Sequence, residues 1–275
     1  MLCNPSSLFA VVAVLVAGLF PAGCTTPSSD GSAEGEGEGE REGEGEGEGE
    51  GEGEGEGEGE GEAVPLAGFG AISGDCGVLD DELTSSSPAT FSNHLDFGVD
   101  AYDDPADRAQ LTDGGERMAA TPNAGGSSLF SEVFAYEMLA RCEGASLLKT
   151  ETEVDYDAPG TKITDMLVQI DGEKIGVSVV RAFHFPPGEP YPPAEAFTHL
   201  TDKLNDIHAS SAHVVAADAW RKQILAVVAY DQPTADVWND VLLGTAPDVP
   251  PVPADVRGDT IVIVTVTDGA DEPLY

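Results

Sequence analysis

Residues 131–182 read SEVFAYEMLARCEGASLLKTETEVDYDAPGTKITDMLVQIDGEKIGVSVVRA, and this stretch decides the fold. Its beginning has apolar residues at helical spacing, which predicts a helix over about 128–141. Three strand-like runs follow at 146–156, 162–170 and 174–182. The dipeptide D-G between the last two runs is a strong signal for a hairpin turn. The stretch therefore predicts one helix followed by three strands.

The pattern continues toward the C-terminus. Prolines and a glycine at 186–193 interrupt the chain, and a helix is expected over about 194–210. A strand at 223–230, a helix at 235–243 and a strand at 260–267 complete the order α-β-β-β-α-β-α-β. This order predicts an α/β fold in which helices flank a mixed β-sheet, with residues 128–275 as the folded domain.

Residues 63–127, ahead of this domain, are rich in Gly, Ser, Asp and Pro and have weak periodicity. We expect an irregular lead-in with one or two short elements. Asp100, Asp103, Asp104 and Asp107 crowd together in it. They suit either a calcium ion or a solvated turn, and the turn is the simpler interpretation.

The first residues of the chain carry signals for localisation. Residues 8–20 form an uncharged apolar run followed by P-A-G-C at 21–24, which resembles a bacterial lipoprotein signal. The resemblance implies a signal peptide at 1–23, a lipid on Cys24 and anchoring in the bacterial cell envelope, with Thr25 favouring the outer membrane. An ordinary cleaved secretion signal is the alternative, since Pro21 and the lack of a basic residue before the run depart from the lipoprotein pattern.

A nearly regular Glu-Gly alternation occupies 34–62, with 15 Glu, 13 Gly and one Arg. It offers nothing to bury, and its charges repel one another, so we predict that 24–62 is a disordered linker. Without this tract and Asp30, the chain keeps 35 acidic against 11 basic residues, a net charge of −24. That charge repels phosphate backbones and argues against nucleic acid as a partner.

Cysteine and histidine usage restricts the covalent and metal chemistry. Cys76 and Cys142 form an even pair in an exported domain, which permits a disulfide, although Cys142 at the end of a helix also suits a buried thiol. The chain has no C-x-x-C motif, and His208 and His213 are five residues apart, so they do not share a helical face. These features argue against a zinc site.

Five short segments carry a family resemblance. They are S-E at 131–132, E-M-L at 137–139, L-L-K-T-E at 147–151, T-D at 164–165 and G-V-S-V-x-R-A at 176–182. In this order they resemble a group of largely uncharacterised proteins related to the PD-(D/E)XK nuclease superfamily. The resemblance covers roughly 129–268 and implies an α-β-β-β-α-β restriction-endonuclease-like core.

The chemistry of that superfamily needs two carboxylates and a lysine at a magnesium ion. By position, the resemblance makes Asp165 the first carboxylate and Glu132 or Glu137 the acid of the helix, so Asp165 and Glu132 are the metal-ligand candidates. The acid and lysine of the third strand would fall at Ser178 and Val180, which cannot fill those roles. The catalytic set is therefore incomplete, and Arg181 points to the opposite face of the strand from Val180.

Two functions follow. The first, which we favour, is a membrane-tethered, non-catalytic module without a cofactor that binds a protein or small ligand through the former active-site cleft. The alternative is a divergent Mg²⁺-dependent hydrolase, such as a nuclease, whose lysine has moved to Lys149, Lys162 or Lys174.

Each candidate residue also has a structural interpretation. Glu132 and Glu137 suit the surface of an amphipathic helix, and Ser178 suits a small position in a strand. Asp165 in an apolar run needs a partner, either Arg181 or a backbone amide. His184 and the prolines after it are expected to form a wall.

Overall fold

The computed structural model of the protein describes residues 70–275 apart from 100, 101, 103, 105, 125 and 127. The predictions for the signal peptide, for Cys24 and for the Glu-Gly linker lie outside the described residues, as does part of the proposed aspartate cluster. None of the helices in the described part of the chain is both long and apolar enough to cross a membrane.

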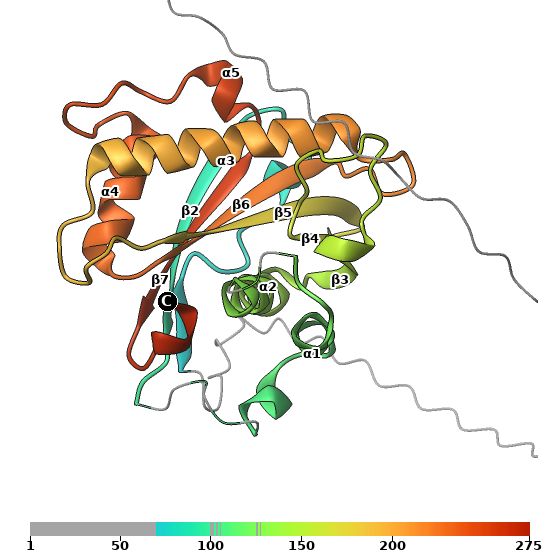
Figure 1. The fold of residues 1–275 in the computed structure, drawn as a ribbon, viewed down its shortest axis with the longest axis horizontal. Coiled ribbons are helices and arrows are strands. Elements are labelled where there is room, and N and C mark those ends of the chain that lie inside the picture. Colours follow the sequence, from blue (N-terminus) through green and yellow to red (C-terminus); the bar gives the residue numbers. More distant parts are fainter. Residues whose placement is uncertain (1–69, 100–101, 103, 105, 125, 127) are drawn as a thin grey trace, which may run out of the picture. The chain divides into compact units, whose positions relative to one another are not determined.

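One seven-stranded sheet organises the domain, in the order β1-β2-β7-β6-β5-β4-β3. Strands β3, β4 and β5 form an antiparallel meander, whereas β5, β6, β7 and β2 run parallel, and β1 is antiparallel to β2. The predicted mixed sheet flanked by helices is confirmed (Figure 1). The strands are β1 (Ala71–Gly74), β2 (Ala89–Asp96), β3 (Ser146–Thr150), β4 (Met166–Ile170), β5 (Glu173–Ala182), β6 (Lys222–Ala229) and β7 (Ile261–Asp268).

Helices cover both faces of the sheet. Helices α1 and α2 pack with one face in a single apolar cluster, and α3, α4 and α5 belong to a second cluster on the other face. The α-helices are α1 (Asp113–Ala120), α2 (Leu129–Glu143), α3 (Pro193–His213), α4 (Gln232–Leu243) and α5 (Ala254–Arg257). Short 3-10 helices lie at η1 (Asp81–Leu83), η2 (Asp107–Gln110), η3 (Glu151–Glu153) and η4 (Glu272–Leu274).

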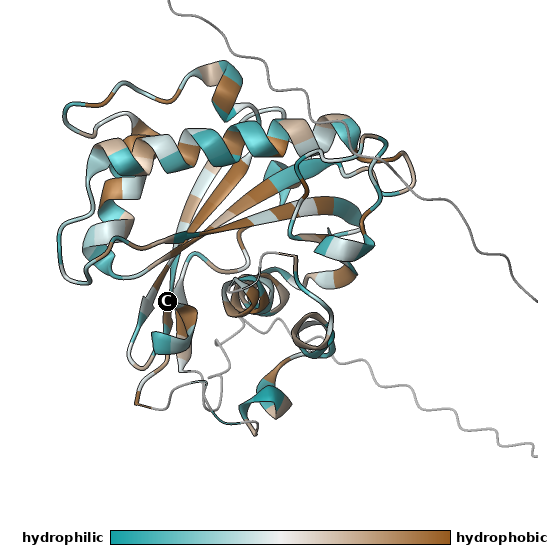
Figure 2. Ribbon diagram, in the orientation of Figure 1, coloured by the Kyte–Doolittle hydropathy of each residue, from teal (hydrophilic) through white to brown (hydrophobic). Residues whose placement is uncertain are grey.

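The central strands are apolar because they are covered on both sides. Every residue of β6 is buried. Ile224 and Ala226 belong to the cluster of α2, and the alternate residues Leu225 and Val227 belong to the cluster of α3. A strand buried on both faces reads as a continuous apolar run rather than an alternating one, which explains the strength of this signal in the sequence (Figure 2).

The expected irregular lead-in at 63–127 is wrong for much of its length. Eight residues of β2 pair in parallel with β7, and β1 adds the edge of the sheet. Strand β2 reads ATFSNHLD and is only partly buried. Its polar residues interrupt the alternation of apolar and polar residues by which a strand is identified in a sequence. Helix α1 contains two glycines, which weaken the helical signal.

This segment is fixed to the rest of the domain. Cys76 and Cys142 form a disulfide with their Cα atoms 4.6 Å apart. The buried ammonium of Lys222 donates to the carbonyl oxygens of Ser85 (2.7 Å) and Ser87 (2.9 Å). The described residues before α2 are therefore part of the same folded unit as the sheet.

Two strands are shorter than expected, and both differences shape the site. The first run ends as a strand at Thr150 and continues as η3, and the second is a strand only from Met166. Glu151 and Asp165 consequently lie just outside β3 and β4, where the alternating side-chain directions of a strand no longer apply.

Candidate functional site

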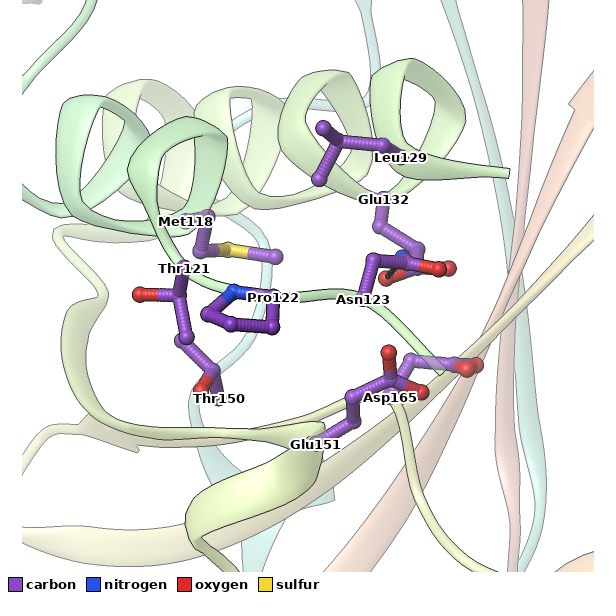
Figure 3. Close-up of a pocket in the computed structure, with 9 residues that line it drawn as sticks. All are labelled: Met118, Thr121, Pro122, Asn123, Leu129, Glu132, Thr150, Glu151 and Asp165. Carbon is purple, nitrogen blue, oxygen red and sulfur yellow. Dashed lines mark hydrogen bonds between the residues drawn. The ribbon is translucent and has the colours of Figure 1, made fainter. Parts of the chain in front are cut away.

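Three carboxylates from separate elements meet beside the sheet. Glu132 lies in the first turn of α2, Glu151 directly follows β3, and Asp165 directly precedes β4. One oxygen from each lies within 4.8 Å of one oxygen from each of the others. Figure 3 shows the three side chains pointing toward the same space. A hard divalent cation is the kind of ligand that such an oxygen set favours.

Backbone contacts position Asp165. Its amide donates to the carbonyl oxygen of Val177 (3.0 Å), and its Oδ2 accepts from the amide of Val179 (2.6 Å). The residue before it, Thr164, is fully buried and donates from its hydroxyl to the same Val177 carbonyl (2.8 Å). The carboxylate is therefore held against the middle of β5 by the chain just outside β4.

The segment between α1 and α2 covers the carboxylates. The amide nitrogen Nδ2 of Asn123 donates to Glu132 Oε2 (2.7 Å), and Ser128 Oγ donates to Glu132 Oε1 (2.6 Å). The backbone amide of Ala124 donates to Glu151 Oε1. Glu132 and Glu151 are 4% and 6% exposed, so these donors replace the water that an exposed carboxylate would bind.

A small cavity lies between the covering segment and the sheet. Its free space is about 10 Å³, close to the volume that one water molecule needs. The lining residues are Met118, Thr121, Pro122, Asn123, Leu129, Glu132, Thr150, Glu151 and Asp165 (Figure 3). The space suits a single small ion or water molecule, and it is too small for an organic ligand.

The electrostatics of the cluster disfavour three negative charges. Burial and the charge of Glu132 raise the pKa of Asp165 to about 7, whereas the positive charge of Lys203 on α3 opposes the rise. Among the described residues, neither Glu132 nor Asp165 forms an ion pair with a lysine or arginine. A proton on Asp165 or a cation beside it would offset the burial and the charge repulsion that act on this carboxyl.

Glu137 does not belong to this cluster. It is buried about one and a half turns beyond Glu132 on α2, where its Oε1 accepts from the backbone amide and hydroxyl of Thr112. Arg141 donates to its Oε2 at 2.9 Å. Glu137 thus links α1 to α2, and neither the site role nor the surface position expected from the sequence applies.

The candidates on and after β5 are not members of the carboxylate group. The hydroxyl of Ser178 is buried 3.5 Å from that of Thr164. Arg181 donates to the carbonyl oxygen of Leu274 (3.1 Å) and does not pair with Asp165, which bonds a backbone amide instead. His184 lies 2.9 Å from Glu195 at the start of α3.

The three lysines considered as replacements for the missing catalytic lysine form hydrogen bonds with other groups. Lys149 donates to Asp218 (2.7 Å), Lys162 donates to Asp206 (3.1 Å), and Lys174 donates to a backbone carbonyl (2.7 Å). Lys203, which the sequence did not single out, is the lysine whose charge acts on Asp165.

Glu151 is the ligand candidate that sequence reasoning missed. It is the last residue of the L-L-K-T-E match, but the run around it was interpreted as one continuous strand. The signal was a Thr followed by three residues rich in acids, T-E-T-E, which is typical of a helical turn after a strand.

Comparison with known proteins gives little further assignment. No family model matches the chain, and no solved structure matches it. The chain is similar to the AAC-rich mRNA clone AAC4 protein of Dictyostelium discoideum, with 44% identity over 165 residues, or 56% of this chain. It spans only 22% of the length of that protein, whose name states no activity.

Proposed function

We propose that this chain is a lipid-anchored envelope protein whose folded domain is a non-catalytic module that binds one divalent cation through Glu132, Glu151 and Asp165. The observation that carries the proposal is the convergence of three carboxylates from three elements on one small cavity. The N-terminal signal and the Glu-Gly tract are the support for a tethered location.

The donor set fits a hard cation. Carboxylate oxygens are preferred ligands of Mg²⁺, Mn²⁺ and Ca²⁺. Ligands on opposite sides of one Ca²⁺ lie about 5 Å apart, and those of Mg²⁺ about 4 Å apart, so a spread within 4.8 Å requires little movement for either ion. A cation would also offset the burial and the repulsion from Glu132 that together raise the pKa of Asp165.

Several features favour binding over catalysis. Ser178 and Val180 occupy the positions where the resemblance requires an acid and a lysine. Asn123 and Ala124 bond two of the carboxylates from outside, so the site is covered on the side away from the sheet. A divalent ion would activate water in a hydrolase, but here Glu132, Glu151 and Asp165 would hold the ion in a space too small for a substrate.

A divergent hydrolase is the second candidate, and one observation favours it. The charge of Lys203 lowers the pKa of Asp165, so this lysine is close enough to act electrostatically on the cluster. It could serve as the displaced lysine if the covering segment moved away and exposed the ion to substrate.

Titration with Mn²⁺ and Mg²⁺ tests the proposal. Calorimetry on the full-length chain should reveal a site that is lost in Asp165→Asn and kept in Asp202→Asn, a matched change at an exposed position of α3. The Glu-Gly tract is the same in the wild type and both variants, so any cation binding by the tract contributes equally to the three titrations. Identical titrations for the wild type and Asp165→Asn would contradict the cation site.

Nuclease assays separate the two candidates. With Mn²⁺ present, we expect no cleavage of plasmid DNA or RNA by the wild type. Cleavage that disappears in both Asp165→Asn and Lys203→Met would establish the hydrolase instead.

A further inference from the structure

The covering segment contains a polar atom without a partner. The side-chain oxygen Oδ1 of Asn123 is buried and accepts no hydrogen bond within the described part of the chain. The nitrogen of the same amide donates to Glu132 Oε2, which sets the orientation of the amide group. Asn123, which carries this buried, unsatisfied acceptor, lines the cavity beside the carboxylates (Figure 3).

Burial of one polar oxygen without a partner costs about 1–3 kcal/mol in protein mutational data. Thr150, which also lines the cavity and is 4% exposed, caps η3 through its side chain and is not such a group. The unsatisfied Asn123 oxygen, in a residue that lines a water-sized cavity next to the carboxylates, points to a small polar occupant that contacts it.

We propose that Asn123 Oδ1 is a fourth protein ligand of the divalent cation, so that the segment before α2 completes the site formed by Glu132, Glu151 and Asp165. This inference rests on the proposed cation site and adds to it a neutral ligand from outside the core expected from the resemblance. Amide oxygens are common ligands of Ca²⁺ and related hard cations.

The assignment has a structural consequence. A ligand in the segment 121–124 couples cation binding to the closure of that segment over the sheet. The bound ion would then be shared between the covering segment and the three core elements, so it would stabilise the folded state rather than present an open coordination position.

Substitution at Asn123 tests the inference in the full-length chain, purified in detergent and titrated with Mn²⁺ by calorimetry and electron paramagnetic resonance. Asn123→Ala should weaken Mn²⁺ binding about 10- to 100-fold, the range seen when a supporting ligand contact is removed. Asn239→Ala is the matched control. Its Oδ1 is also buried without a partner, but it lies on α4, which packs on the opposite face of the sheet. We expect it to bind Mn²⁺ like the wild type.

Asn123→Asp provides a readout that does not depend on Asn123→Ala folding well. The added charge should lower the melting temperature in EDTA, because it faces Glu132. Mn²⁺ should then raise the melting temperature by more than it does in the wild type, because the new carboxylate is a stronger ligand. A residue with a purely structural role would show the loss without the rescue.

The outcomes separate the two proposals. If Asp165→Asn loses Mn²⁺ while Asn123→Ala binds it like Asn239→Ala, Asn123 is not a ligand and the three-carboxylate site survives. If Mn²⁺ fails to rescue Asn123→Asp, the inference is also overturned. If the wild type and Asp165→Asn bind Mn²⁺ equally, the cation site itself is wrong, and the role of Asn123 fails with it.

Discussion

The Asp165→Asn substitution should remove one pH dependence of the domain's stability. In the folded domain, burial and the charge of Glu132 raise the pKa of Asp165 to about 7, from an ordinary value of 3.8. Between these two values the folded state binds more protons than the unfolded state. Stability from this group is therefore highest at low pH and falls as the pH rises through 7.

The expected size follows from the same values. Full ionisation of a carboxyl with this difference in pKa would cost about 4 kcal/mol. Asp165 keeps partial solvent exposure, which weakens the effect, so we expect about 2 kcal/mol between pH 5 and pH 8. Asparagine has no charge and can still accept the hydrogen bond from Val179, so the variant should lose this pH dependence.

Urea unfolding at several pH values, in EDTA, measures the effect as the difference between the wild type and the variant. That difference removes the contributions of other groups, such as Asp218, whose pKa is lowered by its hydrogen bond to Lys149 despite an opposing effect of burial. In EDTA, the stability of the wild type relative to Asp165→Asn should fall as the pH rises.

Addition of Mn²⁺ should invert the trend. Protons compete with the ion for the carboxylates, so binding strengthens as the pH rises, and an ion at 100 times its Kd stabilises a protein by about 2.7 kcal/mol. A constant difference between the two proteins from pH 5 to pH 8 in EDTA would refute the argument that Asp165 is protonated in the folded state near neutral pH.

Three further perturbations test what stabilises the domain and where the protein is located. Reduction of the Cys76–Cys142 disulfide, which spans 66 residues, should destabilise the domain by about 4 kcal/mol in the chain-entropy model; thiol labelling of unreduced, denatured protein should find neither cysteine reactive. Glu137→Gln leaves Arg141 without its charged partner and should lower stability by about 2 kcal/mol in urea unfolding, while Mn²⁺ affinity stays within twofold. Cys24→Ser should move the protein from the membrane to the soluble fraction in detergent partitioning, and unchanged partitioning would contradict lipidation.

The sequence alone predicted the centre of the sheet. Strands β6 and β7 and the middle of β5 are buried on both faces, so most of their residues are apolar, and the Asp171-Gly172 turn separates β4 from β5. Such local patterns reflect the environment of each residue directly. Asp165, and Glu132 as one of two acids on the helix, were also named as ligand candidates, through the resemblance of the short segments around them to the PD-(D/E)XK superfamily.

Tertiary contacts decided the edge of the sheet. Strand β2 has polar residues and partial exposure, and it becomes a strand by pairing with β7, more than 160 residues later in the chain. Its own sequence carries too little apolar periodicity to predict that partner.

The site likewise depends on contacts between distant segments. Glu137 and Glu132 lie on the same helix and look equivalent in the sequence, yet one bonds Thr112 and Arg141 while the other faces the cavity. Glu151 and Asn123 reach that cavity only because β3 ends one residue before Glu151 and because the chain before α2 folds over the sheet. Where a carboxylate points depends on the ends of strands and the path of loops, and those are set by packing between elements that the linear sequence keeps apart.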